Sequence, residues 1–150
     1  MKKLYVMCGV PGSGKSTWLR SHVQDERIVS RDAIRFSLLK PTDEYFAHEA
    51  EVEELFYNSI REKLREYDEV YVDATHLTPR SRAKVMRCAN RRETQVIALV
   101  LSASLTKCLE QNAQRTGRAL VPQNTIKQMF YSFIKPTVKE GFSEIIEIGD

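Results

Sequence analysis

A glycine-rich segment near the start of the chain places the strongest constraint on its fold. A short apolar run from Leu4 to Cys8 leads into the spacing G-x-x-x-x-G-K-[ST], and an amphipathic segment follows. Glycines let successive N–H groups of such a turn point inward, and a following helix adds its free first-turn donors and the positive end of its dipole. The turn is therefore expected to surround a phosphate. The residues that we assign to this loop are Gly9, Pro11, Gly12, Ser13, Gly14, Lys15, Ser16 and Thr17.

Two side chains of this loop carry specific expectations. Lys15 is expected to reach the β- and γ-phosphates of a nucleotide, and the Ser16 hydroxyl is expected to hold Mg²⁺. The sequence thus predicts ATP or another nucleoside triphosphate as phosphate donor, with Mg²⁺ as cofactor. The alternative is a glycine-rich turn that matches by chance, and the strand before it and the helix after it argue against that.

Length and composition indicate one domain over residues 1–150. The chain is 42% hydrophobic, and no apolar run approaches the roughly 18 residues that span a bilayer. Met1-Lys2-Lys3 and the short run after it do not resemble a signal peptide. The three cysteines are scattered and odd in number, which suits a reducing cytoplasm. We therefore expect a cytoplasmic protein with no membrane partner.

Apolar runs alternate with amphipathic segments along the chain. Strands are predicted at residues 4–8, 27–30, 70–72, 96–101 and 145–148. Helices are predicted at residues 16–23, from 33 to the proline at 41, at 52–67, 79–92 and 104–115, and from 122 to about 138. This alternation predicts an α/β fold in which a parallel sheet of about five strands has helices on both faces.

Three polar groups are predicted to meet at the carboxyl edge of this sheet, where such folds bind ligands. They are the phosphate loop, Arg31-Asp32 and Asp73-Ala74-Thr75. A GTP switch would need N-K-x-D and D-x-x-G, which are missing, and motor or AAA-type ATPases usually carry an acidic pair where Asp73 is followed by Ala74. A small phosphotransferase remains, whose chemistry is positioning and electrostatics.

The acceptor side of the site is assigned to Asp32 and Arg35. Asp32 is the candidate general base for an acceptor hydroxyl, and Arg35, one helical turn on, is the candidate cation for the acceptor's phosphate. The alternatives are a helix cap for Asp32 and a surface side chain for Arg35.

Charge is unevenly distributed although the net charge is only +3. Residues 43–54 hold six acids and no lysine or arginine, whereas residues 80–92 hold six basic residues and no acid. A basic helix over residues 80–92 could follow a phosphodiester backbone, or it could be a solvated face.

The chain resembles the kinase module of phage-type polynucleotide 5′-hydroxyl kinases. The resemblance rests on the phosphate loop with Trp18 after it, and on the motifs S-R-D-A-I-R at 30–35, D-A-T-H-L-T-P-R-S-R at 73–82, and N-A-Q-R at 112–115 before Val121-Pro122. It implies a P-loop kinase-like (adenylate-kinase-like) fold with a small helical lid. It also implies ATP-dependent transfer of the γ-phosphoryl group to the 5′-OH end of DNA or RNA. If a phage encodes the protein, the cytoplasm in which it acts would be that of the host cell.

The resemblance further implies roles for individual residues. Asp32 would be the general base, Arg35 would hold the acceptor's 3′-side phosphate, and Arg115 would be the lid arginine that binds the transferring group. Asp73 and Thr75 would line the substrate site.

Two departures from the family pattern qualify this assignment: the residue at position 111, and the slightly different length of the segment 115–120. Gln111 stands where a second lid arginine is expected, so Arg118 is a candidate to supply that cation to the bound nucleotide. No D-x-D-x-T signature of a phosphatase module occurs, which predicts kinase activity alone. The alternatives are a small-molecule kinase for a nucleoside, sugar or antibiotic, and a nucleotide-gated binding module without turnover.

Overall fold

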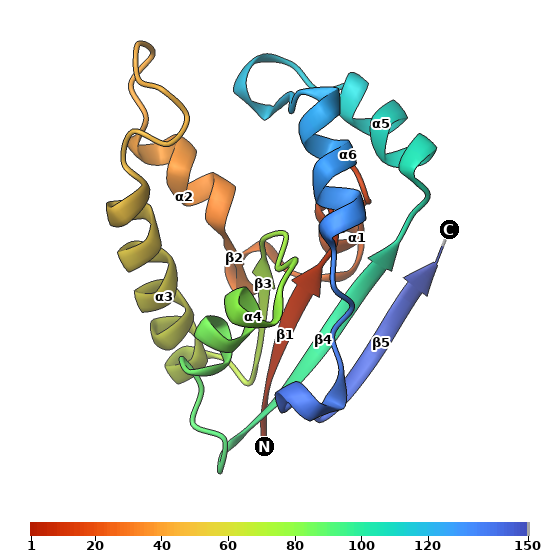
Figure 1. Ribbon diagram of the computed structural model, residues 1–150. Coiled ribbons are helices and arrows are strands. Elements are labelled where there is room, and N and C mark those ends of the chain that lie inside the picture. The colour runs from red at the N-terminus through yellow and green to blue at the C-terminus, as the bar shows by residue number, and fades with distance from the viewer. Residues whose placement is uncertain (150) are drawn as a thin grey trace.

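The computed structural model describes residues 1–149 as a five-stranded parallel sheet with strand order β2-β3-β1-β4-β5 (Figure 1). All four pairings between neighbouring strands are parallel, with Leu4 of β1 opposite Val70 of β3 and Val96 of β4. The strands are β1 (Lys2–Cys8), β2 (Ile28–Ser30), β3 (Glu69–Asp73), β4 (Thr94–Ser102) and β5 (Glu144–Gly149). The expected α/β fold is confirmed.

Helices cover both faces of the sheet. They are α1 (Lys15–His22), α2 (Arg31–Leu38), α3 (Glu49–Glu66), α4 (Pro79–Met86), α5 (Leu105–Ala113) and α6 (Gln123–Ser132). On one face, Phe56 and Ile60 of α3 and Val85 of α4 pack with Leu4 and Val6 of β1. On the other face, Leu19 of α1 packs with Met7 and Leu99. The central strands read as unbroken apolar runs because both of their faces are buried.

A third apolar cluster joins the lid segments to the phosphate loop. Val10 of the loop packs with Cys108 of α5 and Ile126 of α6. In Figure 1, α5 and α6 stand at the carboxyl edge of the sheet on one side, and α2 with the loop that leads to α3 stands on the other. The loop at the end of β1 lies between them.

The structure corrects several predicted boundaries. Ser30 caps α2 by accepting a hydrogen bond from Ala33 N, so the helix begins at Arg31 and Asp32 lies in its first turn. The helix predicted over residues 79–92 ends at Met86. The last helix ends at Ser132, where Phe133 takes an extended conformation, and Val138 lies in the short 3₁₀ helix η3 (Val138–Glu140).

Other local predictions are confirmed. Thr78 caps α4 with Pro79 at the first helical position, and Ser104 caps α5. Cys8 ends β1 and is buried, and the three cysteines are free thiols. Within residues 1–149, no helix is long and apolar enough to cross a bilayer.

Candidate active site

The phosphate loop is anchored between β3 and α5. The Gly9 N–H donates to the Thr75 carbonyl over 3.0 Å, which ties the loop to the end of β3. Gly12 has a φ of 84°, and a Cβ added there would collide with the backbone carbonyl of Cys108 in α5. Only glycine fits this close approach, so the motif fixes the position of α5 as well as the shape of the loop.

Lys15 lies buried inside the loop. Its Nζ donates to the carbonyls of Gly9 over 2.8 Å and Val10 over 3.0 Å. Burial lowers the pKa of this ammonium to about 8, while the nearby Asp73 carboxylate raises it and the Arg115 charge lowers it. The buried Ser13 hydroxyl has no hydrogen-bond partner within residues 1–149. A phosphate oxygen in the loop would accept from both side chains, which fits the predicted nucleotide.

Ser16 and Asp73 bring two hard oxygen ligands together beside the loop. The Ser16 hydroxyl donates to Asp73 Oδ2 over 3.2 Å. Burial raises the pKa of Asp73, and the Lys15 charge and this hydrogen bond counteract the shift. Hydroxyl and carboxylate oxygens suit Mg²⁺, which takes one or two protein ligands and completes its shell with water and phosphate oxygens. The donor set therefore fits the predicted Mg²⁺ site, with Asp73 added to Ser16.

The candidate base Asp32 is exposed but held in place. Its Oδ1 accepts from the Tyr45 hydroxyl over 2.6 Å and from Arg35 Nη1, while 56% of its side chain stays exposed. Asp32 also contributes to the pKa of both Lys15 and Asp73, so its charge is felt at the phosphate loop. The structure thus brings the predicted base and the predicted donor loop to one edge of the sheet.

Arg35 lies in the site, but its guanidinium group is already paired with other side chains. Its side chain is 6% exposed, and its Nε and Nη2 donate to the two oxygens of Glu49 over 3.1 and 2.6 Å. Arg31 donates to the same carboxylate over 3.0 Å. Burial alone would raise the pKa of Glu49, but the hydrogen bonds from Arg35 and Arg31 hold it below its ordinary value. Contact between Arg35 and an acceptor phosphate stays a prediction.

The lid is a loop closed by one buried amide. Asn112, which is 1% exposed, donates to the Val121 carbonyl over 2.7 Å and accepts from the Val121 N–H over 3.0 Å. This pair joins the end of α5 to the start of α6 and leaves the residues between them as a closed loop. Asn112 of the N-A-Q-R motif therefore shapes the lid.

The two lid arginines have different surroundings. Arg115 makes no side-chain hydrogen bond or ion pair within residues 1–149, and its charge lowers the pKa of Lys15. Arg118 Nη2 donates to the carbonyls of Lys40 over 2.8 Å and Pro41 over 2.7 Å. Arg115 is thus free to meet a phosphoryl group, whereas Arg118 joins the lid to the α2–α3 loop. Nucleotide binding by Arg118 stays a prediction.

The basic segment does not form one cationic face. Arg82 is fully buried and pairs with Glu140 over 2.8 Å, and Arg91 donates to the Gly141 carbonyl. Arg80 and Lys84 of this segment line a small cavity together with Glu53 and Tyr57 of α3.

Sequence reasoning missed three parts of the site. Tyr45 holds the base, Glu49 pairs with Arg31 and Arg35, and Asn112 closes the lid. The acidic run at residues 43–54 follows Arg31 and Arg35 in the sequence, and this charge pattern was a signal for Glu49. Closely spaced acids repel one another, so they favour pairing with nearby arginines. Nothing in the sequence singled out Tyr45.

Comparisons with known proteins bear on this geometry. L-seryl-tRNA(Sec) kinase of Methanococcus maripaludis is 28% identical over 145 residues, covering 91% of this chain and 54% of that protein. A protein of Autographa californica nuclear polyhedrosis virus, described as a bifunctional polynucleotide kinase/RNA ligase, is 26% identical over 168 residues. That match covers 99% of this chain and 23% of the viral protein. The chain therefore spans about half of the first relative and about a quarter of the second.

A solved structure and a family model complete the comparison. A gluconokinase from Sinorhizobium meliloti 1021 has the same fold, with a TM-score of 0.60 and 19% identity over 98% of this chain and 82% of its own. The family model described as "AAA domain" matches residues 4–136. Because this model matches most of the chain, from β1 through the phosphate loop and the lid to residue 136, the chain belongs to this family.

Proposed function

We propose that the chain is an ATP-dependent polynucleotide 5′-hydroxyl kinase. The observation that carries the proposal is Asp32, an exposed carboxylate held by Tyr45 and Arg35 at the edge of the sheet that also carries Lys15. Both curated relatives have names that place their acceptor on a nucleic acid, a polynucleotide in one and a seryl-tRNA in the other. The proposal covers the kinase step alone.

In the proposed reaction, Asp32 accepts the proton of the 5′-hydroxyl group. The freed oxygen forms a bond to the γ-phosphorus of ATP while the bond from that phosphorus to the β–γ bridging oxygen breaks, and ADP leaves with that oxygen. Lys15 and Arg115 supply positive charge to the transferring group, which is where such reactions gain most of their rate. Bound Mg²⁺, held through Ser16 and Asp73, would neutralise phosphate charge.

The test is label transfer from γ-labelled ATP to a 5′-hydroxyl oligonucleotide. Wild-type protein is expected to label the oligonucleotide, and Asp32→Asn is expected to lower kcat by about 10²- to 10⁴-fold, because a positioned base contributes that much. Asp25→Asn is the matched control, since Asp25 is exposed in the short 3₁₀ helix η1 (Asp25–Arg27) before β2, at the opposite end of that strand.

Three outcomes would contradict parts of the proposal. Full activity of Asp32→Asn would remove Asp32 as the base. Strong labelling of a free nucleoside or gluconate, with none on oligonucleotides, would favour a small-molecule kinase, whose fold the gluconokinase shares. Nucleotide-dependent oligonucleotide binding without transfer in the presence of Mg²⁺ would favour a binding module.

A further inference from the structure

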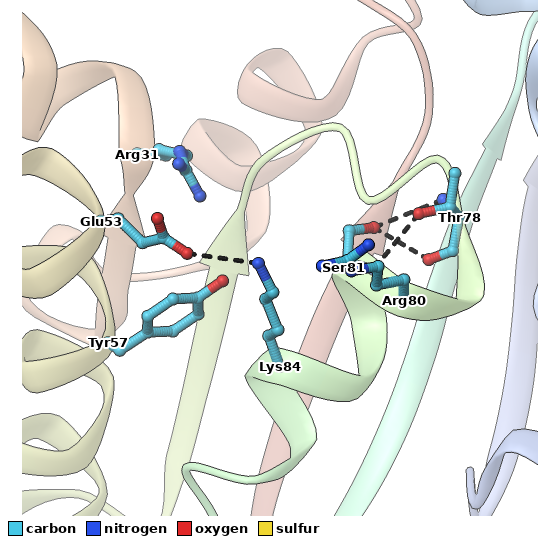
Figure 2. Close-up of a pocket in the computed structure, with 7 residues that line it drawn as sticks. All are labelled: Arg31, Glu53, Tyr57, Thr78, Arg80, Ser81 and Lys84. Carbon is cyan, nitrogen blue, oxygen red and sulfur yellow. Dashed lines mark hydrogen bonds and ion pairs between the residues drawn. The ribbon is translucent and has the colours of Figure 1, made fainter. Parts of the chain in front are cut away.

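A small polar cavity lies between α3 and α4 (Figure 2). Glu53 and Tyr57 of α3 form one side, Arg80 and Lys84 of α4 form the other, and Arg31 at the start of α2 lies above them. Its volume is about 250 Å³. Three cations and one carboxylate line it, so its charge favours an anion.

The pairing of these cations leaves one positive group unmatched. Lys84 Nζ lies 3.4 Å from Glu53 Oε1, and Arg31 is paired with Glu49. Arg80 is exposed, and its side chain makes no hydrogen bond or ion pair with any residue of 1–149. It stands at the second position of α4, whose N-terminus is fixed by the reciprocal hydrogen bonds between Thr78 and Ser81. A rigid element thus presents a free guanidinium to the cavity.

The size of the cavity restricts what it can hold. Clefts that enclose whole small molecules measure roughly 300–1,000 Å³, and this one is smaller. It can hold a single charged group of a larger ligand. A guanidinium beside hydroxyl groups is a typical partner for a phosphate.

The cavity is coupled to the reacting end of the site through one carboxylate. Glu49 accepts from Arg31, which lines the cavity, and from Arg35, which pairs with Asp32. Arg31 and Asp32 are also consecutive in the first turn of α2. A strand whose 5′ end meets Asp32 therefore has the cavity beside it.

We propose that this cavity binds a backbone phosphate of the acceptor strand that lies further along the strand than the 3′-side phosphate expected at Arg35, with Arg80 as its main contact. This inference rests on the proposed function. It makes the cavity a second point of attachment for the strand, separate from the donor loop.

The experiment measures binding by fluorescence anisotropy, so it needs no phosphate transfer. The probe is a 3′-labelled, 5′-hydroxyl single-stranded oligonucleotide, titrated at several salt concentrations. Arg80→Ala is expected to raise Kd roughly tenfold, as for loss of one charged hydrogen bond, and to reduce the slope of log K against log salt by about 0.7. Arg80→Lys is expected to restore the slope because it restores the charge.

Arg87→Ala is the matched control, since Arg87 is an exposed arginine at the other end of α4. It should bind the oligonucleotide as wild-type protein does. Equal Kd and slope for Arg80→Ala and Arg87→Ala would overturn the inference, as would a wild-type protein that binds no oligonucleotide. Weaker binding of ATP rather than of the oligonucleotide by Arg80→Ala would also overturn it, since the cavity would then serve the donor.

Label transfer separates this inference from the proposed function. Oligonucleotide binding that depends on Arg80, without transfer of label, would support the cavity and contradict the kinase assignment. Transfer of label by a protein whose oligonucleotide binding is unchanged by Arg80→Ala would support the kinase assignment and contradict the role of the cavity.

Discussion

At the scale of single residues, His76 is the most unusual side chain outside the reacting groups. It is 4% exposed and has a φ of 45°, a left-handed conformation that is uncommon for residues other than glycine. Its Nδ1 lies 2.5 Å from the Met7 carbonyl, which can only accept, so Nδ1 carries the hydrogen. The buried Nε2 then has no partner within residues 1–149. Protonation would place an unmatched charge in the core.

This environment predicts that acid destabilises the protein through His76. Burial lowers the pKa of His76 to about 4, the hydrogen bond to Met7 raises it, and the charges of Lys15, Arg31 and Arg82 lower it further. The pKa in the unfolded chain is near 6.5, so the unfolded state binds more protons between pH 6.5 and about 4. The stability that comes from a neutral His76 is complete above pH 6.5 and is lost as pH falls towards 4.

Urea unfolding at two pH values measures this effect. Between about pH 7 and pH 5 the His76 contribution should fall by roughly 2 kcal/mol. His76→Asn keeps a residue that tolerates a positive φ and should lose less stability over this interval. His22→Asn, at the exposed end of α1, should behave as wild-type protein does. Equal losses in the wild-type and His76→Asn proteins would contradict the assignment.

At the scale of elements, the lid makes a prediction about its two arginines. Arg115 has no partner within residues 1–149, whereas Arg118 is bound to the carbonyls of Lys40 and Pro41. Arg115→Ala should therefore lower kcat by about 100-fold or more, the range for removing a cation from a transferring phosphoryl group. Arg118→Ala should cost much less in kcat and should speed hydrogen exchange of the lid amides, because it releases the lid from the α2–α3 loop. A loss in kcat from Arg118→Ala equal to that from Arg115→Ala would show that Arg118 replaces the missing arginine at Gln111.

Element boundaries also show what the sequence can and cannot predict. The phosphate loop, the α/β alternation and the caps at Thr78 and Ser104 were predictable because each depends on neighbouring residues. The end of α4 at Met86 was not predictable, because the basic residues that follow the helix are as polar as those within the helix. The pairing of Arg35 with Glu49 depends on how α2 packs on α3, and no local pattern carries that. From the sequence, Asp32 and Lys15 were therefore correctly predicted to lie at the carboxyl edge of the sheet. Nothing in the sequence indicated that Arg35 is buried.

At the scale of the whole molecule, the strand order joins the parts of the donor site across the sheet. β3 pairs with β1, so Asp73 at the end of one strand meets the loop at the end of the other. The loop in turn packs against α5 and α6, which follow β4. A nucleotide with Mg²⁺ would therefore contact segments that are far apart in sequence, and its binding free energy should stabilise the fold as a unit.

This arrangement predicts a large, metal-dependent stabilisation by nucleotide. A non-hydrolysable ATP analogue with Mg²⁺ at about 100 times its Kd should raise the free energy of unfolding by about 2.7 kcal/mol, measured as a shift in Tm. Removing Mg²⁺ with EDTA should reduce the shift in Tm. The Asp73→Asn substitution should also reduce the shift when Mg²⁺ is present, but it should change the shift little in EDTA. Lys15→Ala should reduce the shift in both conditions, because Lys15 is expected to contact the phosphates directly. The Asp25→Asn control should keep the full shift, and an Asp73→Asn protein with the wild-type response to Mg²⁺ would remove Asp73 from the metal site.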